Sequence, residues 1–306
     1  MKDVKRIVVG IPTFKRPDSL KRLLESIANQ QTSLALHILV ADNEGDEGSG
    51  LAVINSTFAE GFPYPLSGIA VRQRGISAVR NALIDFAFGE LAADGLAMID
   101  DDERVCSVWI SRLVEIQKLG GFDVVAGTVL SEFEVPPPDW MSSLSIYHRK
   151  TYPEGPIPMI YGTGNIFLAR SFYQHYPGFY FDHAFGLSGG GDAEFFTRLK
   201  LKGASFGYSP ESISYEFVNE SRMTKAWAIQ RAYRIGSSEA RIFVIHAMSL
   251  KKLALQGLKI STALVLSPLL YILFIWSPSR RMEVVLLMVR QLGKLNGFFG
   301  KPMQYY

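Results

Sequence analysis

The sequence predicts an α/β protein built on a doubly wound, mostly parallel β-sheet. Short apolar runs typical of buried strands alternate with segments of helical periodicity. Polar residues follow several of these runs, and in open α/β sheets this carboxyl edge is where ligands bind. A strongly apolar segment near the C-terminus predicts a further helical region, associated with a membrane.

The N-terminal third of the chain supplies the alternation of strands and helices. We expect strands over residues 6–11, 36–41, 69–71 and 96–99. One helix is expected after Pro17, with Asp18 or Ser19 as its N-cap, and another over residues 76–88. In the first helix, apolar residues recur at the spacing of one helix face: Leu20, Leu23, Leu24 and Ile27.

Polar clusters follow three of the predicted strands. They are Pro12-Thr13, Asp42-Asn43 and Asp100-Asp101-Asp102. Because parallel strands end at the same edge of a sheet, we expect these three loops to converge. Further along, we expect helices over 109–118 and 193–202 and a strand over 123–130, with Gly203 ending the later helix.

Composition limits the possible functions. The chain has 306 residues, 48% of them hydrophobic, and a formal net charge of only +3, which argues against a general nucleic-acid binder. Its single cysteine, Cys106, excludes a disulfide within the chain and a cysteine zinc cluster. The short apolar stretch near the N-terminus leads into a polar motif, so we do not expect a signal peptide.

The acidic run at residues 100–103 is the clearest sign of a site. Carboxylates crowded at the end of a buried strand repel one another unless a cation or solvent relieves the repulsion. A hard divalent cation that also holds phosphates is one explanation, and a solvated acidic turn is the alternative.

Five segments occur in an order that resembles family 2 glycosyltransferases of the GT-A fold. They are residues 9–16 (VGIPTFKR), 40–43 (VADN), 74–81 (RGISAVRN), 100–102 (DDD) and 190–194 (GGDAE). The resemblance covers about residues 7–241. It implies a nucleotide-diphosphate sugar donor, with UDP as the expected nucleotide, and Mg²⁺ or Mn²⁺ as cofactor.

The resemblance also implies which residues hold the donor. Asp102 is the expected metal ligand, Asp100 is expected near the ribose or an outer-shell water, and Arg80 is expected to pair with a phosphate. Thr13 and Asp42 would hold the ribose and the base. The remaining donor-site candidates are Pro12, Arg16, Asn43, Asp101, Gly190, Gly191 and Glu194. We expect Gly164 and Asn165 to form a wall beside the donor sugar, with a tight turn before a strand as the alternative. Arg231 would meet the diphosphate of the donor or of a lipid-linked acceptor, with a solvated basic helix face as the alternative.

Asp192 is the expected catalytic base. It would take the proton from an acceptor hydroxyl that attacks the anomeric carbon opposite the leaving group, so that the configuration inverts. A helix N-cap is the alternative role, and both can hold at once. Where the family commonly has Glu-Asp, this chain has Gly191-Asp192, and we expect Glu194 to supply part of the missing charge.

The C-terminal segment suggests a membrane. Residues 260–276 carry no charge, contain Pro268, and are flanked by lysines and arginines on both sides. A kinked or re-entrant hairpin fits this pattern, and a single span is the alternative. Beyond it, charged residues recur at helical spacing, which predicts a cationic helix lying on the membrane: Glu283, Arg290, Lys294 and Lys301. A buried hairpin in a soluble domain is the other interpretation.

Together these features predict an inverting, metal-dependent glycosyltransferase. We expect it to add one sugar to a lipid-linked glycan at the cytoplasmic face of the cell membrane, in polysaccharide or lipopolysaccharide assembly. Residues 1–105 would bind the nucleotide sugar, 106–241 the acceptor and the base, and 242–306 the membrane. A sugar nucleotidyltransferase and a catalytically silent scaffold are the rival hypotheses.

Overall fold

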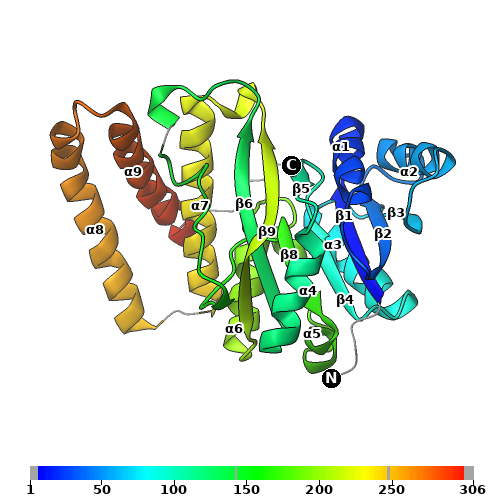
Figure 1. The fold of residues 1–306 in the computed structure, drawn as a ribbon. Helices are drawn as coiled ribbons and strands as arrows, with labels where there is room; N and C mark the ends of the chain where they lie inside the picture. Colours follow the sequence, from blue (N-terminus) through cyan, green and yellow to red (C-terminus); the bar gives the residue numbers. More distant parts are fainter. Residues whose placement is uncertain (1–5, 142, 247–248, 300–306) are drawn as a thin grey trace. The chain divides into compact units, whose positions relative to one another are not determined.

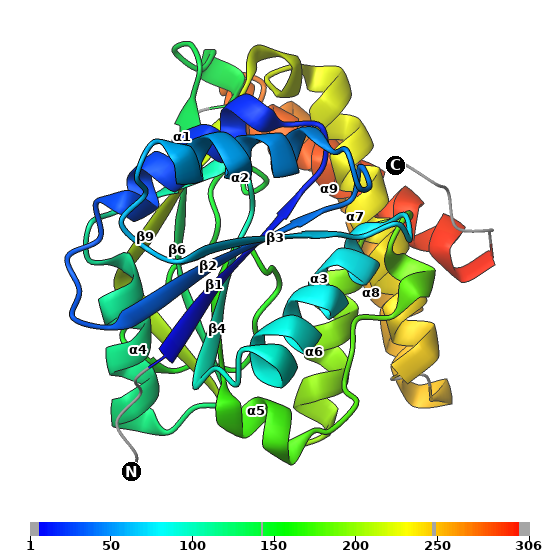
Figure 2. The same cartoon turned by 90° about the vertical axis from the view of Figure 1, so that its right-hand side faces the viewer.

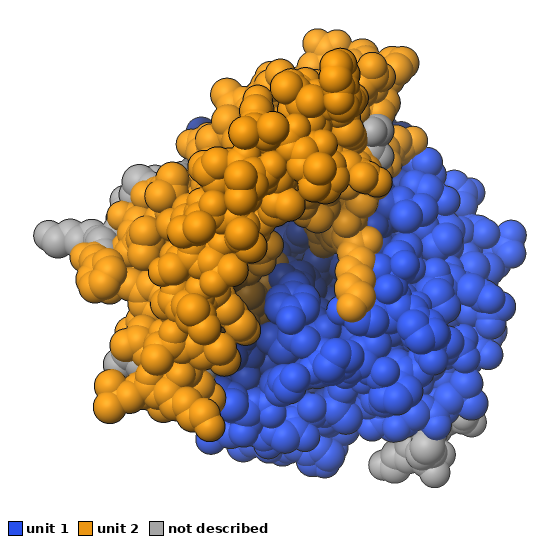
Figure 3. Space-filling view, turned by 90° about the vertical axis from the view of Figure 1, so that its left-hand side faces the viewer, with its two compact units in different colours: residues 1–130, 151–187, 194–216 blue, residues 131–150, 188–193, 217–306 orange. Residues whose placement is uncertain are grey.

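The computed structural model describes residues 6–141, 143–246 and 249–299, so Lys301 lies outside the described part. The chain divides into two compact units (Figure 3). Unit 1 comprises residues 1–130, 151–187 and 194–216, and unit 2 comprises 131–150, 188–193 and 217–306. This division does not follow the predicted boundaries at 105 and 241. The second of these falls inside one long helix, α7 (Lys225–His246).

The strands of the described residues form one sheet in the order β3-β2-β1-β4-β8-β6-β9-β5, with β7 pairing β9 (Figure 1). β3, β2, β1 and β4 are parallel, and the pairs β4–β8, β8–β6, β9–β5 and β7–β9 are antiparallel. The bounds are β1 Arg6–Thr13, β2 Ala35–Asp42, β3 Leu66–Ala70, β4 Gly95–Ile99, β5 Glu103–Val105, β6 Val124–Phe133, β7 Gly155–Pro156, β8 Asn165–Ala169 and β9 Phe206–Val218. The predicted α/β class is confirmed, and the structure adds the antiparallel half.

Helices cover both faces of the sheet in unit 1 (Figure 2). Their bounds are α1 Pro17–Ala28, α2 Ser49–Ala59, α3 Ile76–Asp85, α4 Trp109–Gly120, α5 Arg170–His175 and α6 Gly191–Leu201. A short π-helical turn, Phe86–Glu90, continues α3. α2 was not predicted, because its sequence alternates small polar and apolar residues and buries only Gly50 and Ile54.

α1 shows where the sequence pattern was right and where it was not. The four residues with helical spacing, Leu20, Leu23, Leu24 and Ile27, are its buried residues, as predicted. The predicted N-cap was wrong, because the helix begins at Pro17 and Asp18 lies in its first turn. Proline is well suited to the first position, where its missing N–H has no partner to lose.

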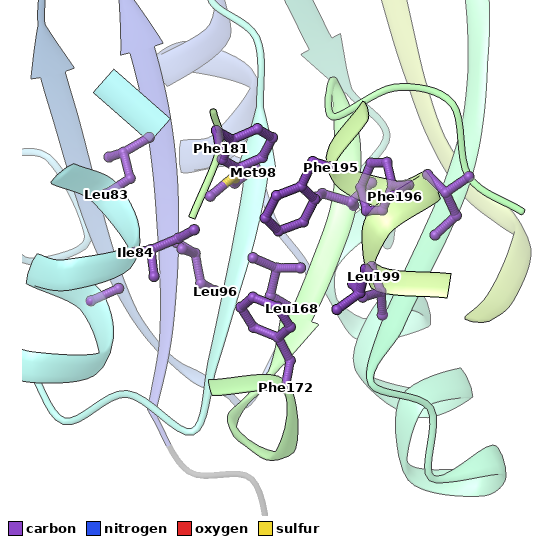
Figure 4. Packing of buried hydrophobic residues seen from close by; sticks show 14 of the residues in the cluster. Leu83, Ile84, Leu96, Met98, Leu168, Phe172, Phe181, Phe195, Phe196 and Leu199 are labelled. Carbon is purple, nitrogen blue, oxygen red and sulfur yellow. The ribbon is translucent and has the colours of Figure 1, made fainter. Parts of the chain in front are cut away.

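The core of unit 1 has two layers because side chains alternate across each strand. Ile7, Val9 and Ile11 of β1 pack toward α1 and α4, whereas Val8 packs toward α3, α5 and α6. Phe181 and Phe195 stack in the second layer, with ring centroids 4.0 Å apart (Figure 4). Apolar side chains thus pack on both faces of the sheet, and this packing holds the carboxyl ends of β1 and β4 in place.

Unit 2 is largely helical. α7 (Lys225–His246), α8 (Leu250–Leu273) and α9 (Pro278–Phe299) account for most of it. A small core joins α7 and α9 to the segment 131–150: Met141, Leu144, Tyr147, Val218, Met223, Ala228, Ala232, Met282 and Leu286. α8 is continuous through Pro268 and is the one helix, within the described residues, long and apolar enough to cross a membrane.

The predicted surface helix at the C-terminus corresponds to α9, and part of it packs inside unit 2. α9 buries Met282, Val284 and Leu286, and Arg290 forms an ion pair with Glu239 of α7. Part of the apolar surface of α9 is therefore used inside unit 2, while Leu287, Leu292, Leu295 and Phe299 are exposed. α8 is the more exposed of the two helices, and a membrane-surface role for α9 stays a prediction.

Candidate active site

The acidic run and the end of the first strand meet in unit 1. β1 lies beside β4 in parallel register, so Thr13 at the end of β1 is close to the residues that follow Ile99. The Thr13 hydroxyl donates to Asp101 Oδ2 at 2.8 Å, and both side chains are buried. The sheet edge predicted from the sequence therefore exists, with Asp101 turned toward the strand that bears Thr13.

Arg16 connects the two later aspartates. Its Nη1 lies 3.0 Å from Asp101 Oδ1 and 3.0 Å from Asp102 Oδ2. Burial raises the pKa of Asp101 to about 6, and the nearby Asp102 carboxylate adds to the rise, while Arg16 and the Thr13 hydroxyl oppose it. Asp101 is thus a buried structural acid that holds Arg16 and Thr13 at the site.

The first aspartate is held from the other side by α3. Arg80 Nη2 lies 3.2 Å from Asp100 Oδ1, and the Arg80 side chain is itself only 6% exposed. The side chains of Asp100 and Asp102 are 32% and 15% exposed, against 6% for Asp101. Alternate residues of the run therefore face the solvent, each with an arginine beside it.

The site fits a divalent cation shared with a ligand. Among the described residues, no group of three or more His, Cys, Asp or Glu side chains could hold a metal by itself. Mg²⁺ is usually bound by one or two carboxylates together with substrate phosphates. Asp102 and Asp100 supply oxygen ligands of this kind, and they are the more open acids of the run.

Asp42 and Asn43 have different positions from those expected. Asp42 is fully buried, and its two oxygens accept the backbone N–H groups of Glu44 and Leu51. Asn43 donates to the carbonyls of Val71 and Gln73 and accepts from the N–H of Gly75. Both side chains organise the loops around the strand end, and their roles in donor binding stay predictions. Pro12 is likewise a buried strand residue, in register with Ala41.

Gly164 and Asn165 were predicted to lie together beside the donor sugar, but their surroundings differ. A Cβ on Gly164 would lie 2.1 Å from Glu103 Oε1 and 3.2 Å from Asp100 Oδ2, so Gly164 lies against the acidic run. Asn165 is turned into the sheet, where it donates to Thr128 O and Ser212 O and accepts from Trp109 Nε1. Its amide is fully used there, and a sugar-binding role does not fit.

The segment with the expected base belongs to unit 2. Gly189 and Gly190 have positive φ angles of 78° and 85°, a backbone conformation that favours glycine. Asp192 lies in the first turn of α6, one residue beyond the helix start, and not before the helix as an N-cap would. Gly191 is buried at that start.

Glu194, two residues later, does not supply free negative charge. Its carboxylate is 2% exposed and accepts from Arg198 Nε at 2.8 Å and from Arg198 Nη2 at 3.0 Å. Arg198 also donates to Tyr180 O. The expectation that Glu194 replaces the acid missing at Gly191 was wrong, because Arg198 neutralises it inside the core of unit 1.

Two α7 residues that the sequence did not reveal hold the glycine segment. Arg241 Nη1 donates to Ser188 Oγ at 2.9 Å, and Ser238 Oγ donates to Gly189 O at 3.4 Å. These residues lie three apart, on one helix face. No sequence motif marks them. Arg231, the expected phosphate ligand of this helix, lies over the Trp227 ring at 5.1 Å.

Comparison with known proteins identifies the class. Residues 8–176 match the family described as "Glycosyl transferase family 2". The chain is 31% identical over 307 residues to "Succinoglycan biosynthesis protein ExoM" of Rhizobium meliloti (strain 1021), covering 98% of this chain and 95% of that protein. The chain therefore belongs to glycosyl transferase family 2 and is a glycosyltransferase, which sets aside the nucleotidyltransferase and scaffold hypotheses.

Solved structures support the same fold. S. aureus TarS 1–349 in complex with UDP-GlcNAc matches with a TM-score of 0.55 and 14% identity, covering 94% of this chain and 92% of that one. TarS 1–349 in complex with UDP matches with a TM-score of 0.53 and 11% identity, covering 95% and 90%. At this identity the similarity establishes the architecture, and the predicted GT-A fold is confirmed.

Proposed function

We propose that this enzyme is an inverting, metal-dependent transferase that moves one sugar from a nucleotide-diphosphate sugar to a lipid-linked glycan. The observation that carries the proposal is the gathering of Asp100, Asp101 and Asp102 with Arg16 and Arg80 at the carboxyl ends of β1 and β4. This cluster combines hard oxygen ligands with guanidinium groups, which is the chemistry that a diphosphate needs.

The donor half of the proposal concerns unit 1. Asp102 and Asp100 would hold Mg²⁺ or Mn²⁺, and the metal, when bound, would neutralise the diphosphate as it leaves. Arg80 is buried and fixed beside Asp100, so it presents its charge without a large loss of side-chain entropy. The TarS structures contain UDP and UDP-GlcNAc, which supports UDP as the nucleotide for this chain as well.

The acceptor half concerns Asp192. We propose that its carboxylate removes the proton from the acceptor hydroxyl as the hydroxyl oxygen bonds to the anomeric carbon. The bond from that carbon to the diphosphate oxygen breaks with its electron pair, and attack opposite the leaving group inverts the configuration. Support comes from the place of Asp192 in the first turn of α6, next to glycines that leave room for a sugar.

The proposed acceptor and its location rest on the relative ExoM and on helix α8. ExoM is named for succinoglycan biosynthesis, and we propose an equivalent place for this chain in cell-surface polysaccharide assembly. A lipid-linked acceptor at the cytoplasmic face of the membrane agrees with the exposed apolar helix α8. Residues 1–105 remain the proposed donor-binding part, and the segment with Asp192 the acceptor-binding part.

Incubation with a panel of nucleotide sugars tests this proposal. We expect nucleotide to be released from one UDP-sugar in the presence of Mg²⁺ or Mn²⁺, and much faster when an extract of lipid-linked glycans is added. Release that is unaffected by excess EDTA would contradict the metal dependence. Equal release with and without the lipid extract would contradict the lipid-linked acceptor.

A further inference from the structure

α8 leaves most of its circumference exposed. Among its outward residues, Val265 is 70% exposed, Leu269 65% and Ile272 65%, and Trp276 just beyond it is 93% exposed. The buried residues Ile260 and Ser267 lie seven apart on a single seam against α9. Exposed apolar area of this extent on a helix of 24 residues marks an interaction surface.

The helices beside α8 determine how it can meet a partner. α7 and α9 run in the same direction, because Gly293 lies against Tyr233 and Gly297, four residues later, lies against Ser237, also four residues later. α8 connects the C-terminal end of α7 to the N-terminal end of α9, so it runs in the opposite direction to both. It lies along the side of α9 that faces away from α7 (Figure 1). Only residues 274–277 connect it to α9.

The start of α9 is fixed to the segment 131–150 of unit 2. Ser145 donates its hydroxyl to Glu283 Oε1 at 2.6 Å and its N–H to Glu283 Oε2 at 3.2 Å. Met282 packs in the same small core as Met141 and Leu144. The C-terminal end of α8 is thus held on the same side of a membrane as these residues.

A transmembrane orientation of α8 conflicts with this packing. If α8 crossed a bilayer, α9 and α7 would lie at the same depth, with Arg290, Glu239 and Arg241 in the hydrocarbon region. We infer that α8 lies in the plane of an anionic bilayer, with its outward apolar side sunk below the headgroups and both of its ends at the cytoplasmic surface. This names the membrane partner of the proposed function and rests on it.

The charges around α8 favour a bilayer over a second copy of the chain. Lys251, Lys252 and Lys259 are exposed near its start, and Arg280 is exposed after its end. Anionic headgroups pair with these cations while acyl chains cover the apolar side. A second α8 would cover the apolar side but offers no acid, because residues 249–282 contain neither Asp nor Glu.

Flotation with vesicles tests the surface without using enzyme activity. The full chain should bind vesicles of phosphatidylcholine and phosphatidylglycerol in equal parts, and bind less at high salt.

The variant Val265→Ser/Leu269→Ser/Ile272→Ser should bind at least about a hundredfold more weakly. The matched control Phe58→Ser/Leu119→Ser/Leu201→Ser removes side chains that are 70%, 73% and 64% exposed in unit 1, and should bind like the unchanged chain. Substitutions are used because a deletion would strip Met282 and Leu286 from the core of unit 2.

Cysteine labelling tests the orientation. In a Cys106→Ser background, Ser249→Cys and Ser277→Cys place one thiol at each end of α8. On bound vesicles, both thiols should react with a membrane-impermeant maleimide added outside. Protection of one thiol would show that α8 spans the bilayer and would overturn the inference.

Two further results would also overturn it. One is a full chain that does not float with vesicles at low salt. The other is a stable dimer in light scattering that the triple serine variant of α8 abolishes, since the apolar side would then be an interface between two copies. Each result leaves the nucleotide-release test unaffected, so failure here is distinguishable from failure of the proposed transferase.

Discussion

Gly164 lies directly against Glu103: a Cβ added at Gly164 would come within 2.1 Å of Glu103 Oε1. Glu103 is 3% exposed and is the residue that follows the three aspartates, so its carboxyl group has little room to move. The backbone at Gly164 therefore sets how closely the loop can approach the acidic run. The sequence predicted a donor-site role for Gly164 and included Glu103 in the acidic run, but it did not show that the two residues lie against each other.

We expect Gly164→Ala to destabilise the protein by about 1–3 kcal/mol, because the added methyl must displace a buried carboxyl group. It should also weaken nucleotide-sugar binding, since Asp100 Oδ2 would lie 3.2 Å from the same methyl. Thermal unfolding and calorimetric titration measure the two effects. Gly89→Ala is the matched control, because nothing lies within 4 Å of a Cβ there. Equal behaviour of the two variants would contradict the close packing.

Asp102→Asn should lower transfer by at least about a hundredfold and weaken nucleotide binding, while the melting temperature stays unchanged. The reason is that Asp102 is the more open of the two acids beside Arg16 and the proposed metal ligand. Steady-state kinetics with and without Mn²⁺ provide the measurement. Asp46→Asn removes an exposed acid paired with Arg72 and should have no effect on transfer. A fully active Asp102→Asn enzyme would remove the metal assignment.

Asp192→Asn and Glu194→Gln should have opposite consequences. Asp192→Asn should lower transfer by roughly 10²–10⁴-fold with nucleotide-sugar affinity kept within a few fold, because a general base acts on the acceptor. Glu194→Gln should instead lower the free energy of unfolding by about 1–3 kcal/mol, because it breaks the buried pair with Arg198. Transfer assays and thermal melts on both variants distinguish the roles. An inactive but stable Glu194→Gln enzyme would reverse the assignment.

Arg241→Met should lower kcat while KM for the donor is kept, since Arg241 holds Ser188 in the segment that precedes Asp192. Arg241→Lys should restore part of kcat, because a lysine can still donate to the Ser188 hydroxyl. Initial-rate kinetics at saturating acceptor measure both. A parallel loss of melting temperature and kcat, with no difference between Met and Lys, would mean that Arg241 only stabilises unit 2.

Gly293→Ala should destabilise unit 2 by about 1–3 kcal/mol, because its Cβ would lie 2.1 Å from the carbonyl oxygen of Tyr233 on α7. Gly257→Ala, in exposed α8 with open space around the Cβ, should be neutral or stabilise by up to about 1 kcal/mol. Chemical denaturation measures the difference. If both alanines stabilise the protein, α7 and α9 are not in close contact at Gly293.

Local patterns in the sequence were enough to predict much of unit 1. Hydrophobic periodicity identified α1 and its four buried residues, and apolar runs identified β1, β2 and β4, because burial of one face is a short-range property of the chain. The order of motifs predicted the family. The same patterns predicted that Thr13 and the acidic run meet at one sheet edge, because parallel strands must end together.

The tertiary structure decided what the side chains do. Asn165 and Glu194 carry the functional groups expected of a site, yet their partners Trp109 and Arg198 enclose them in the core. The Glu194–Arg198 spacing is local, at i and i+4 of one helix, but the burial of that pair and the contact between Asn165 and Trp109 depend on residues far apart in the chain. The same holds for the C-terminal helices. Their composition alone suggested a membrane for both α8 and α9, and only the tertiary structure shows that α9 packs closely on α7 through glycines, which leaves α8 the more exposed helix.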